Sequence, residues 1–161
     1  MMVFDSAARP KNQNTGTSAA RRRATLAVLC VTLLLISLDN TILNVALPSI
    51  VRGLQATSTQ LQWIVDAFAV FFAGMLLTFG ALGDRLGRKW VFMSGLVVFG
   101  CGSACAAWSG TPDRLTAARA LMGLGAAALM PSTLSILTNV FTGDRDRSRA
   151  IGIWSGTAGL G

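Results

Sequence analysis

GALGDRLGRKWVF, residues 80–92, is a charged stretch between two long apolar runs, and it carries Asp84, Arg85, Arg88 and Lys89. The run before it, residues 53–83, contains a single charged residue, and the run after it, residues 90–112, contains none. A helix needs about 20 apolar residues to cross the hydrocarbon core of a bilayer. Two such runs joined by a short charged turn therefore predict a helical hairpin in a membrane.

The composition of the whole chain agrees with a membrane location. Of its 161 residues, 52% are hydrophobic, the mean hydropathy is +0.56, and His, Tyr and Glu are absent from the sequence. The net charge of +7 does not predict nucleic-acid binding, because the basic residues form short clusters between apolar runs. We therefore expect the lipid bilayer as a partner and no nucleic acid.

Five apolar runs follow a polar N-terminal stretch. Residues 1–23 show no apolar periodicity and end in three arginines, so we expect a disordered, basic cytoplasmic tail. Residues 24–161 are expected to form a transmembrane bundle, with spans at about 24–48, 59–82, 90–110 and 114–138 and an incomplete span at 150–161. The predicted fold is an all-α membrane protein with four full transmembrane helices and the start of a fifth.

Basic residues concentrate in every second connection. Eleven of the 14 lie in the tail, between the second and third spans, or between the fourth and fifth: Arg9, Lys11, Arg21, Arg22, Arg23, Arg85, Arg88, Lys89, Arg145, Arg147 and Arg149. Arg52 and Arg114 lie in the other two connections. Because cytoplasmic loops are enriched in Lys and Arg, we expect a cytoplasmic N-terminus in a cell membrane.

Three ionisable residues lie inside the predicted spans: Asp39, Asp66 and Arg119. An ionised side chain there costs at least about 3 kcal/mol unless it faces a partner or water. Counting along each helix places all three roughly 9 to 12 Å below its outer end. We expect an acid and the arginine to form a buried pair that lines a cavity, where substrate or a proton competes for the carboxylate. A static ion pair that only fixes helix packing is the alternative.

Small residues and a proline mark points where the helices are expected to approach each other. Gly123 and Ala127 are four residues apart, a spacing that allows close helix packing in a bilayer. Pro131 lies inside the fourth span, where it removes a backbone hydrogen bond and is expected to bend the helix.

Metal binding and soluble catalysis have few candidate residues. Cys30, Cys101 and Cys105 all fall within apolar runs, and their odd number fits no disulfide framework. No His or acidic residue stands near Cys101 and Cys105 to complete a metal site. Without His, Glu or a phosphate-binding Gly-rich loop, we expect neither an enzyme nor a metal or other cofactor.

Residues 80–92 resemble the signature that joins spans 2 and 3 throughout the major facilitator superfamily. The matching positions are Gly80, Asp84, Gly87, Arg88 and Lys89. The resemblance implies the N-terminal part of a major facilitator helical bundle. It also implies that this segment, Arg85 included, latches the two halves of a transporter and governs switching between outward and inward states. A purely topogenic loop would explain the basic residues but neither the acid nor the glycine spacing.

LDNTILNVALPSI, residues 38–50, is similar to the span 1 signature of the drug:proton antiporter branch with fourteen spans. Asp39, Asn44 and Pro48 are among the matching residues. The resemblance makes Asp39 a candidate proton- or cation-sensing carboxylate and Asn44 a candidate for the same cavity. LQWIVDAF, residues 61–68, also resembles the family's entry to span 2, with Phe68 where Tyr is frequent.

RALMGLGAAALMP, residues 119–131, resembles the span 4 signature of the same antiporters. Arg119, Gly123 and Gly125 match, and Met122 stands where the family often has Gln. The resemblance implies that Arg119 takes part in proton coupling and that the closely spaced glycines belong to the helix packing.

Together these stretches imply proton-coupled efflux of drugs or other small amphipathic molecules by alternating access. The proton gradient would supply the energy, and the expected partners are a small-molecule substrate and the missing C-terminal helices of the same transporter. Four and a half spans supply only part of one half of such a cavity, so we expect the chain to be a fragment. The alternative is a truncated membrane partner or scaffold that moves nothing. A nutrient facilitator shares the loop signature but fits residues 38–50 poorly.

Overall fold

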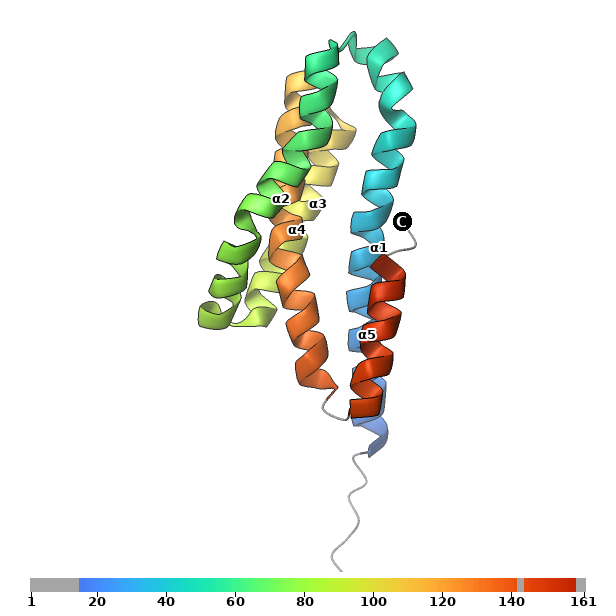
Figure 1. Ribbon diagram of the computed structural model, residues 1–161, viewed down its shortest axis with the longest axis vertical. Coiled ribbons are helices and arrows are strands. Elements are labelled where there is room, and N and C mark those ends of the chain that lie inside the picture. The colour runs from blue at the N-terminus through green and yellow to red at the C-terminus, as the bar shows by residue number, and fades with distance from the viewer. Residues whose placement is uncertain (1–14, 142–143, 159–161) are drawn as a thin grey trace, which may run out of the picture.

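The computed structural model describes residues 15–141 and 144–158, which contain five α-helices and their short connections (Figure 1). They are α1 (Thr15–Leu54), α2 (Ser58–Leu86), α3 (Arg88–Ala107), α4 (Pro112–Val140) and α5 (Asp144–Ala158). No strand occurs in these two ranges, so the all-α prediction is confirmed.

Four of the helices have the length and apolar composition needed to cross a bilayer. These are Arg22–Leu54 within α1, with 33 residues, and the whole of α2, α3 and α4, with 29, 20 and 29 residues. About 20 residues span the hydrocarbon core, so each of these helices is long enough to cross it. The number of such helices matches the four full spans expected from the sequence. The fifth helix, α5, has 15 residues in the described part of the chain.

Several helix ends differ from the sequence-based expectation, among them the end of α1 at Leu54, where residue 48 was expected, and the start of α5 at Asp144, where residue 150 was expected. Helix α1 begins at Thr15, so the prediction of a disordered tail is wrong for residues 15–23, while residues 1–14 lie outside the described part. Ala and Arg are strong helix formers, which allows the helix of the first span to continue backwards into the basic cluster. Helix α3 ends at Ala107, before the expected residue 110, and the Trp108 backbone N–H donates to the Ala104 carbonyl at 3.3 Å.

Local sequence explains where the central helices begin. Thr57 and Gln60 form a capping box at the start of α2, with the Thr57 N–H donating to the Gln60 side-chain oxygen at 3.0 Å. The Thr111 hydroxyl accepts from the Arg114 N–H at the start of α4, and Pro112 follows as the first helical residue. Between α2 and α3, Gly87 has φ +95°, a value that favours glycine, and this single residue turns the chain.

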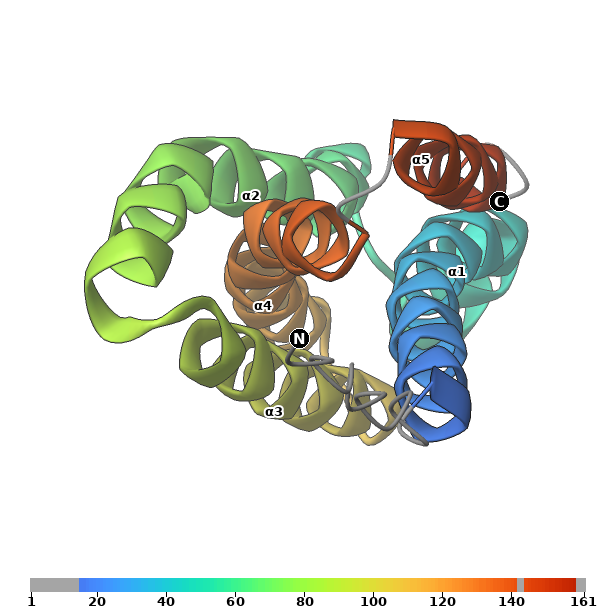
Figure 2. The same ribbon diagram turned by 90° about the horizontal axis from the view of Figure 1, so that it is seen from below.

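Helix α4 lies at the centre of the bundle, between α2 and α3 (Figure 2). Two glycines permit this close packing. A Cβ on Gly123 would lie 2.5 Å from the Phe68 carbonyl oxygen of α2, and a Cβ on Gly125 would lie 2.6 Å from the Phe99 nitrogen of α3. Helix α1 makes few contacts with α2, touches α4 and runs beside α5 (Figures 1 and 2).

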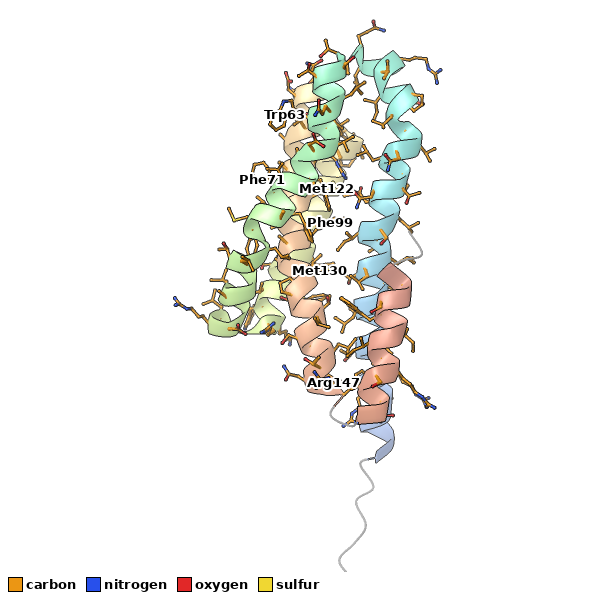
Figure 3. The ribbon with its side chains drawn as sticks, in the orientation of Figure 1. Trp63, Phe71, Phe99, Met122, Met130 and Arg147 are labelled. Carbon is orange, nitrogen blue, oxygen red and sulfur yellow. The ribbon has the colours of Figure 1, made fainter. Side chains whose placement is uncertain are left out.

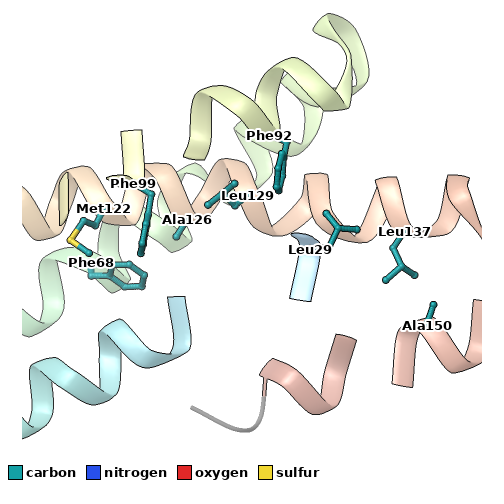
Figure 4. Close-up of a cluster of buried hydrophobic side chains, with 9 residues drawn as sticks. All are labelled: Leu29, Phe68, Phe92, Phe99, Met122, Ala126, Leu129, Leu137 and Ala150. Atoms are coloured by element: carbon teal, nitrogen blue, oxygen red, sulfur yellow. The ribbon is translucent and has the colours of Figure 1, made fainter. Parts of the chain in front are cut away.

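The buried apolar side chains gather around α4 (Figure 4). The largest cluster comprises Leu29, Phe68, Phe92, Phe99, Met122, Ala126, Leu129, Leu137 and Ala150. Around the outside, large apolar side chains remain exposed, such as Val45 at 76% and Leu77 at 84%, and Trp63 and Phe71 project from α2 (Figure 3). An apolar exterior of this extent fits hydrocarbon rather than water.

Candidate functional site

The buried charge at the centre of the bundle is the guanidinium of Arg119 on α4. Its Nη1 donates to the Asp39 carboxylate of α1, so the two residues form an ion pair although 80 positions separate them in the chain. The Arg119 side chain is 3% exposed and the Asp39 side chain 23% exposed. A charge buried this deeply is stable only with a counter-charge and further polar partners, so the pair joins α1 to α4.

Two more groups contact the same guanidinium. Nη2 donates to the side-chain oxygen of Asn40 on α1 at 3.3 Å, and the guanidinium carbon lies 4.7 Å from the centre of the Phe68 ring of α2. The third nitrogen of the guanidinium, Nε, is buried without a hydrogen-bond partner among the described residues. Helices α1, α2 and α4 therefore meet at Arg119.

A cavity of about 500 Å³ lies between α1, the end of α3 and α4. Asp39 and Arg119 contribute its charged groups, and the rest of its wall is mostly apolar, with Ile42, Leu43 and Met122 among the lining residues. An apolar wall with a few convergent polar groups is typical of a small-molecule site. The arrangement can accept an amphipathic molecule whose polar end meets the ion pair.

The other two residues expected at this cavity lie elsewhere. Asp66 on α2 is half-buried and does not line the cavity, and among the described residues its carboxylate makes no hydrogen bond or ion pair. Asn44 on α1 is exposed, and its side-chain N–H donates to the Asn40 carbonyl of the same helix at 2.9 Å. Of the four candidates, the structure brings together only Asp39 and Arg119.

The segment 80–89 forms the end of α2, the turn at Gly87 and the start of α3. Arg88 pairs with the Asp84 carboxylate one helical turn earlier, and its Nη1 also donates to the Pro131 carbonyl of α4 at 3.2 Å. Gly80 lies against Pro131, with 3.9 Å between its ideal Cβ position and the proline Cβ. Arg85 and Lys89 are exposed. Arg88 thus connects the charged turn between α2 and α3 to helix α4.

Comparison with known protein families shows to which family this chain belongs. The family model described as Major Facilitator Superfamily matches residues 29–161, which is most of the chain. The chain belongs to the major facilitator superfamily. Its four long apolar helices accordingly make it a multi-pass membrane protein of a transporter family.

Relatives of this major facilitator chain carry names of drug efflux and resistance proteins. It is 43% identical to the multidrug efflux pump LfrA of Mycolicibacterium smegmatis over 142 residues, which are 88% of this chain and 28% of the relative. It is 38% identical to the methyl viologen resistance protein SmvA of Salmonella typhimurium over 135 residues, 84% of this chain and 27% of the relative. It is also 38% identical to the puromycin resistance protein pur8 of Streptomyces alboniger over 141 residues, 88% of this chain and 28% of the relative. The chain thus spans less than a third of the length of these relatives.

Sequence reasoning missed two groups of this major facilitator site. Asn40 stands beside Asp39 inside an apolar span, and this position was the only signal for its contact with Arg119. Phe68 drew notice only as a replacement for a frequent Tyr, because nothing in a linear sequence indicates that its ring faces a cation on another helix. No cluster of three potential metal ligands occurs among the described residues.

The Arg88 contacts give a prediction on stability. Replacing Arg88 with glutamine removes the partly exposed pair with Asp84 and the charged hydrogen bond to the Pro131 carbonyl, so we expect a loss of about 1 kcal/mol. Thermal unfolding in detergent measures it. Arg85→Gln is the matched control, because Arg85 is exposed and forms no ion pair in the described part. Equal unfolding temperatures for the two variants would contradict the role of Arg88.

Proposed function

We propose that this chain forms the first helices of a proton-coupled exporter of drugs or other small amphipathic molecules. The observation that carries the proposal is the Asp39–Arg119 pair in the wall of a mostly apolar cavity. A proton that binds the Asp39 carboxylate competes with the Arg119 guanidinium for the same oxygen atoms. Exchange of a proton for a substrate at Asp39 therefore couples the proton gradient to export.

The shape and chemistry of the cavity support an amphipathic substrate. Its mostly apolar wall has few hydrogen-bonding groups that would select one molecular shape, so it accepts molecules of different shape. The ion pair offers a contact for a polar or charged end of the substrate. The names of the relatives refer to different compounds, among them methyl viologen and puromycin. Both the apolar wall and the variety of these compounds agree with a cavity that accepts several kinds of substrate.

Alternating access requires parts of the protein to switch between two arrangements around this cavity. We assign the segment 80–89 to the gate, because Arg88 ties the α2–α3 turn to Pro131 on α4, the helix that also carries Arg119. A movement of the turn then changes the position of α4 and with it the ion pair.

Efflux of ethidium, a fluorescent lipophilic cation, tests the function. The complete reading frame that contains this chain is expressed in bacteria that lack their main efflux pumps. We expect energised cells to expel ethidium faster than vector controls, and we expect a protonophore to stop the excess efflux. Efflux that survives the protonophore would exclude proton coupling. Expression in the membrane without efflux of ethidium, methyl viologen or puromycin would favour a non-transporting membrane partner.

The proposed orientation places the N-terminus and α5's first residues on the cytoplasmic side. In a background with Cys30, Cys101 and Cys105 replaced by serine, single cysteines are introduced by Gly110→Cys and Ser148→Cys, two exposed positions. We expect a membrane-impermeant maleimide to label the Gly110→Cys variant on intact cells and the Ser148→Cys variant only after permeabilisation. The reverse labelling pattern would invert the orientation.

A further inference from the structure

The guanidinium of Arg119 has three different kinds of partner, two on α1 and one on α2. Asp39 supplies a negative charge, Asn40 supplies a neutral oxygen at 3.3 Å, and the Phe68 ring lies 4.7 Å from the guanidinium carbon. An aromatic face attracts a cation through the negative part of its quadrupole, and the attraction increases when the site is shielded from water. The Arg119 side chain is almost fully buried, so all three contacts act in such surroundings.

Both neutral partners are held in position by other contacts. The Asn40 side-chain N–H donates to the Ile36 carbonyl of its own helix at 3.1 Å, which leaves the side-chain oxygen directed at Arg119. The backbone of Phe68 packs directly on Gly123, one turn along α4 from Arg119. The ring of Phe68 also stacks on Phe72, with 6.0 Å between centroids and 7° between planes. The amide and the ring are therefore positioned by contacts that do not involve Asp39.

The charge balance at this point changes when a proton binds Asp39. Asp39 is the one carboxylate that pairs with Arg119 in the described part of the chain. On α2, Asp66 makes no ion pair there, and α3 has no charged residue from Trp90 to its end. A protonated Asp39 would leave the buried guanidinium without a counter-charge, and its remaining described partners would all be neutral: the carboxylic acid itself, Asn40 and Phe68.

We propose that Asn40 and Phe68 are positioning residues that hold the Arg119 guanidinium in place while Asp39 carries a proton. The ring contributes more in that state, because an isolated cation interacts with the quadrupole more strongly than an ion pair does. The two residues thereby lower the free-energy cost of proton uptake at Asp39. The proposal rests on the proton exchange at Asp39 proposed above.

Stepwise fluorination of the Phe68 ring tests this role without changing its shape. Fluorine withdraws electron density from the ring face, so mono-, di- and trifluoro-phenylalanine at position 68 weaken the cation contact progressively. We expect the external pH for half-maximal ethidium efflux to fall with each fluorine, by about half a pH unit for the trifluoro ring. The direction follows because a less stabilised guanidinium makes proton uptake harder, so a higher proton concentration is required.

Matched controls use neighbouring residues of the same type. Fluorination of Phe72, which stacks on Phe68 and has no described contact with Arg119, is expected to leave the pH for half-maximal efflux unchanged. Asn40→Leu is expected to shift it in the same direction as fluorination of Phe68. Asn44→Leu, the same change one turn further along, is expected to have no such effect, because among the described residues the Asn44 side chain bonds only to its own helix.

The outcomes separate this inference from the proposed function. Proton-driven efflux that persists in Asp39→Asn would overturn the proposed function itself. Loss of efflux in Asp39→Asn, combined with an unchanged pH for half-maximal efflux in trifluorinated Phe68, would overturn only the positioning role. An equal shift from fluorination at Phe68 and at Phe72 would also overturn it, because the effect would then not depend on contact with the cation.

Discussion

Replacing Asp39 with asparagine is expected to lower proton-driven efflux at least about tenfold, which corresponds to about 1.4 kcal/mol in the barrier. Asparagine keeps the size of the side chain but cannot exchange a proton, and it leaves Arg119 without its counter-charge. The apolar spans are unchanged, so we expect normal amounts of the protein in the membrane. Ethidium efflux driven by an imposed proton gradient measures the loss.

Two further variants separate transport from stability. Asp66→Asn makes the same chemical change at a carboxylate that forms no ion pair in the described part, and it should retain most of the efflux. Asp39→Asn leaves the buried guanidinium unpaired, so we expect it to lower the unfolding temperature. Adding Arg119→Gln removes that charge, so the unfolding temperature should recover while efflux stays low. Efflux at normal rates in Asp39→Asn would exclude Asp39 as the proton carrier.

Gly123→Val is expected to prevent normal packing of α4, with a loss of about 3 kcal/mol in folding stability. A Cβ at this position would lie 2.5 Å from the Phe68 carbonyl oxygen, which belongs to the backbone of α2 and cannot rotate away. The two helices would have to separate, and Phe68 would move away from Arg119. The fraction of protein that stays monodisperse after detergent extraction, and its unfolding temperature, measure the effect.

Gly100→Val is the matched control for this change. Gly100 is also a helical glycine in a span, but a Cβ there would meet no atom within 4 Å in the described part of the chain. We expect this variant to extract and unfold like the unsubstituted protein. If Gly123→Val behaved in the same way, the close contact between α2 and α4 would not be present in the membrane.

The comparison of Gly123 with Gly100 also shows what a sequence pattern leaves open. Both glycines stand four residues before an alanine in an apolar span, so both carry the small-residue spacing of close helix packing. Only Gly123 is buried against another helix, while Gly100 is exposed. The spacing identifies a face that permits close approach, but the neighbouring helix decides whether the face is used.

The amino-acid sequence was sufficient to predict the all-α membrane fold, the four spans, the resemblance to the major facilitator superfamily and the rare charged residues within the spans. These features depend on composition and on position along the chain, since each helical residue advances a fixed 1.5 Å. Counting therefore placed Asp39, Asp66 and Arg119 at similar depth. Counting does not say which way each side chain faces across the bundle.

The folded structure was needed to show that Arg119 pairs with Asp39 and not with Asp66. It was also needed to show that Phe68 and Asn40 contact Arg119, and that Arg88 reaches Pro131. These contacts depend on the rotation and lateral position of each helix. The packing of side chains and backbones between helices sets both, as Gly123 does where α4 meets α2. Such packing joins residues far apart in the chain, so no local pattern contains it.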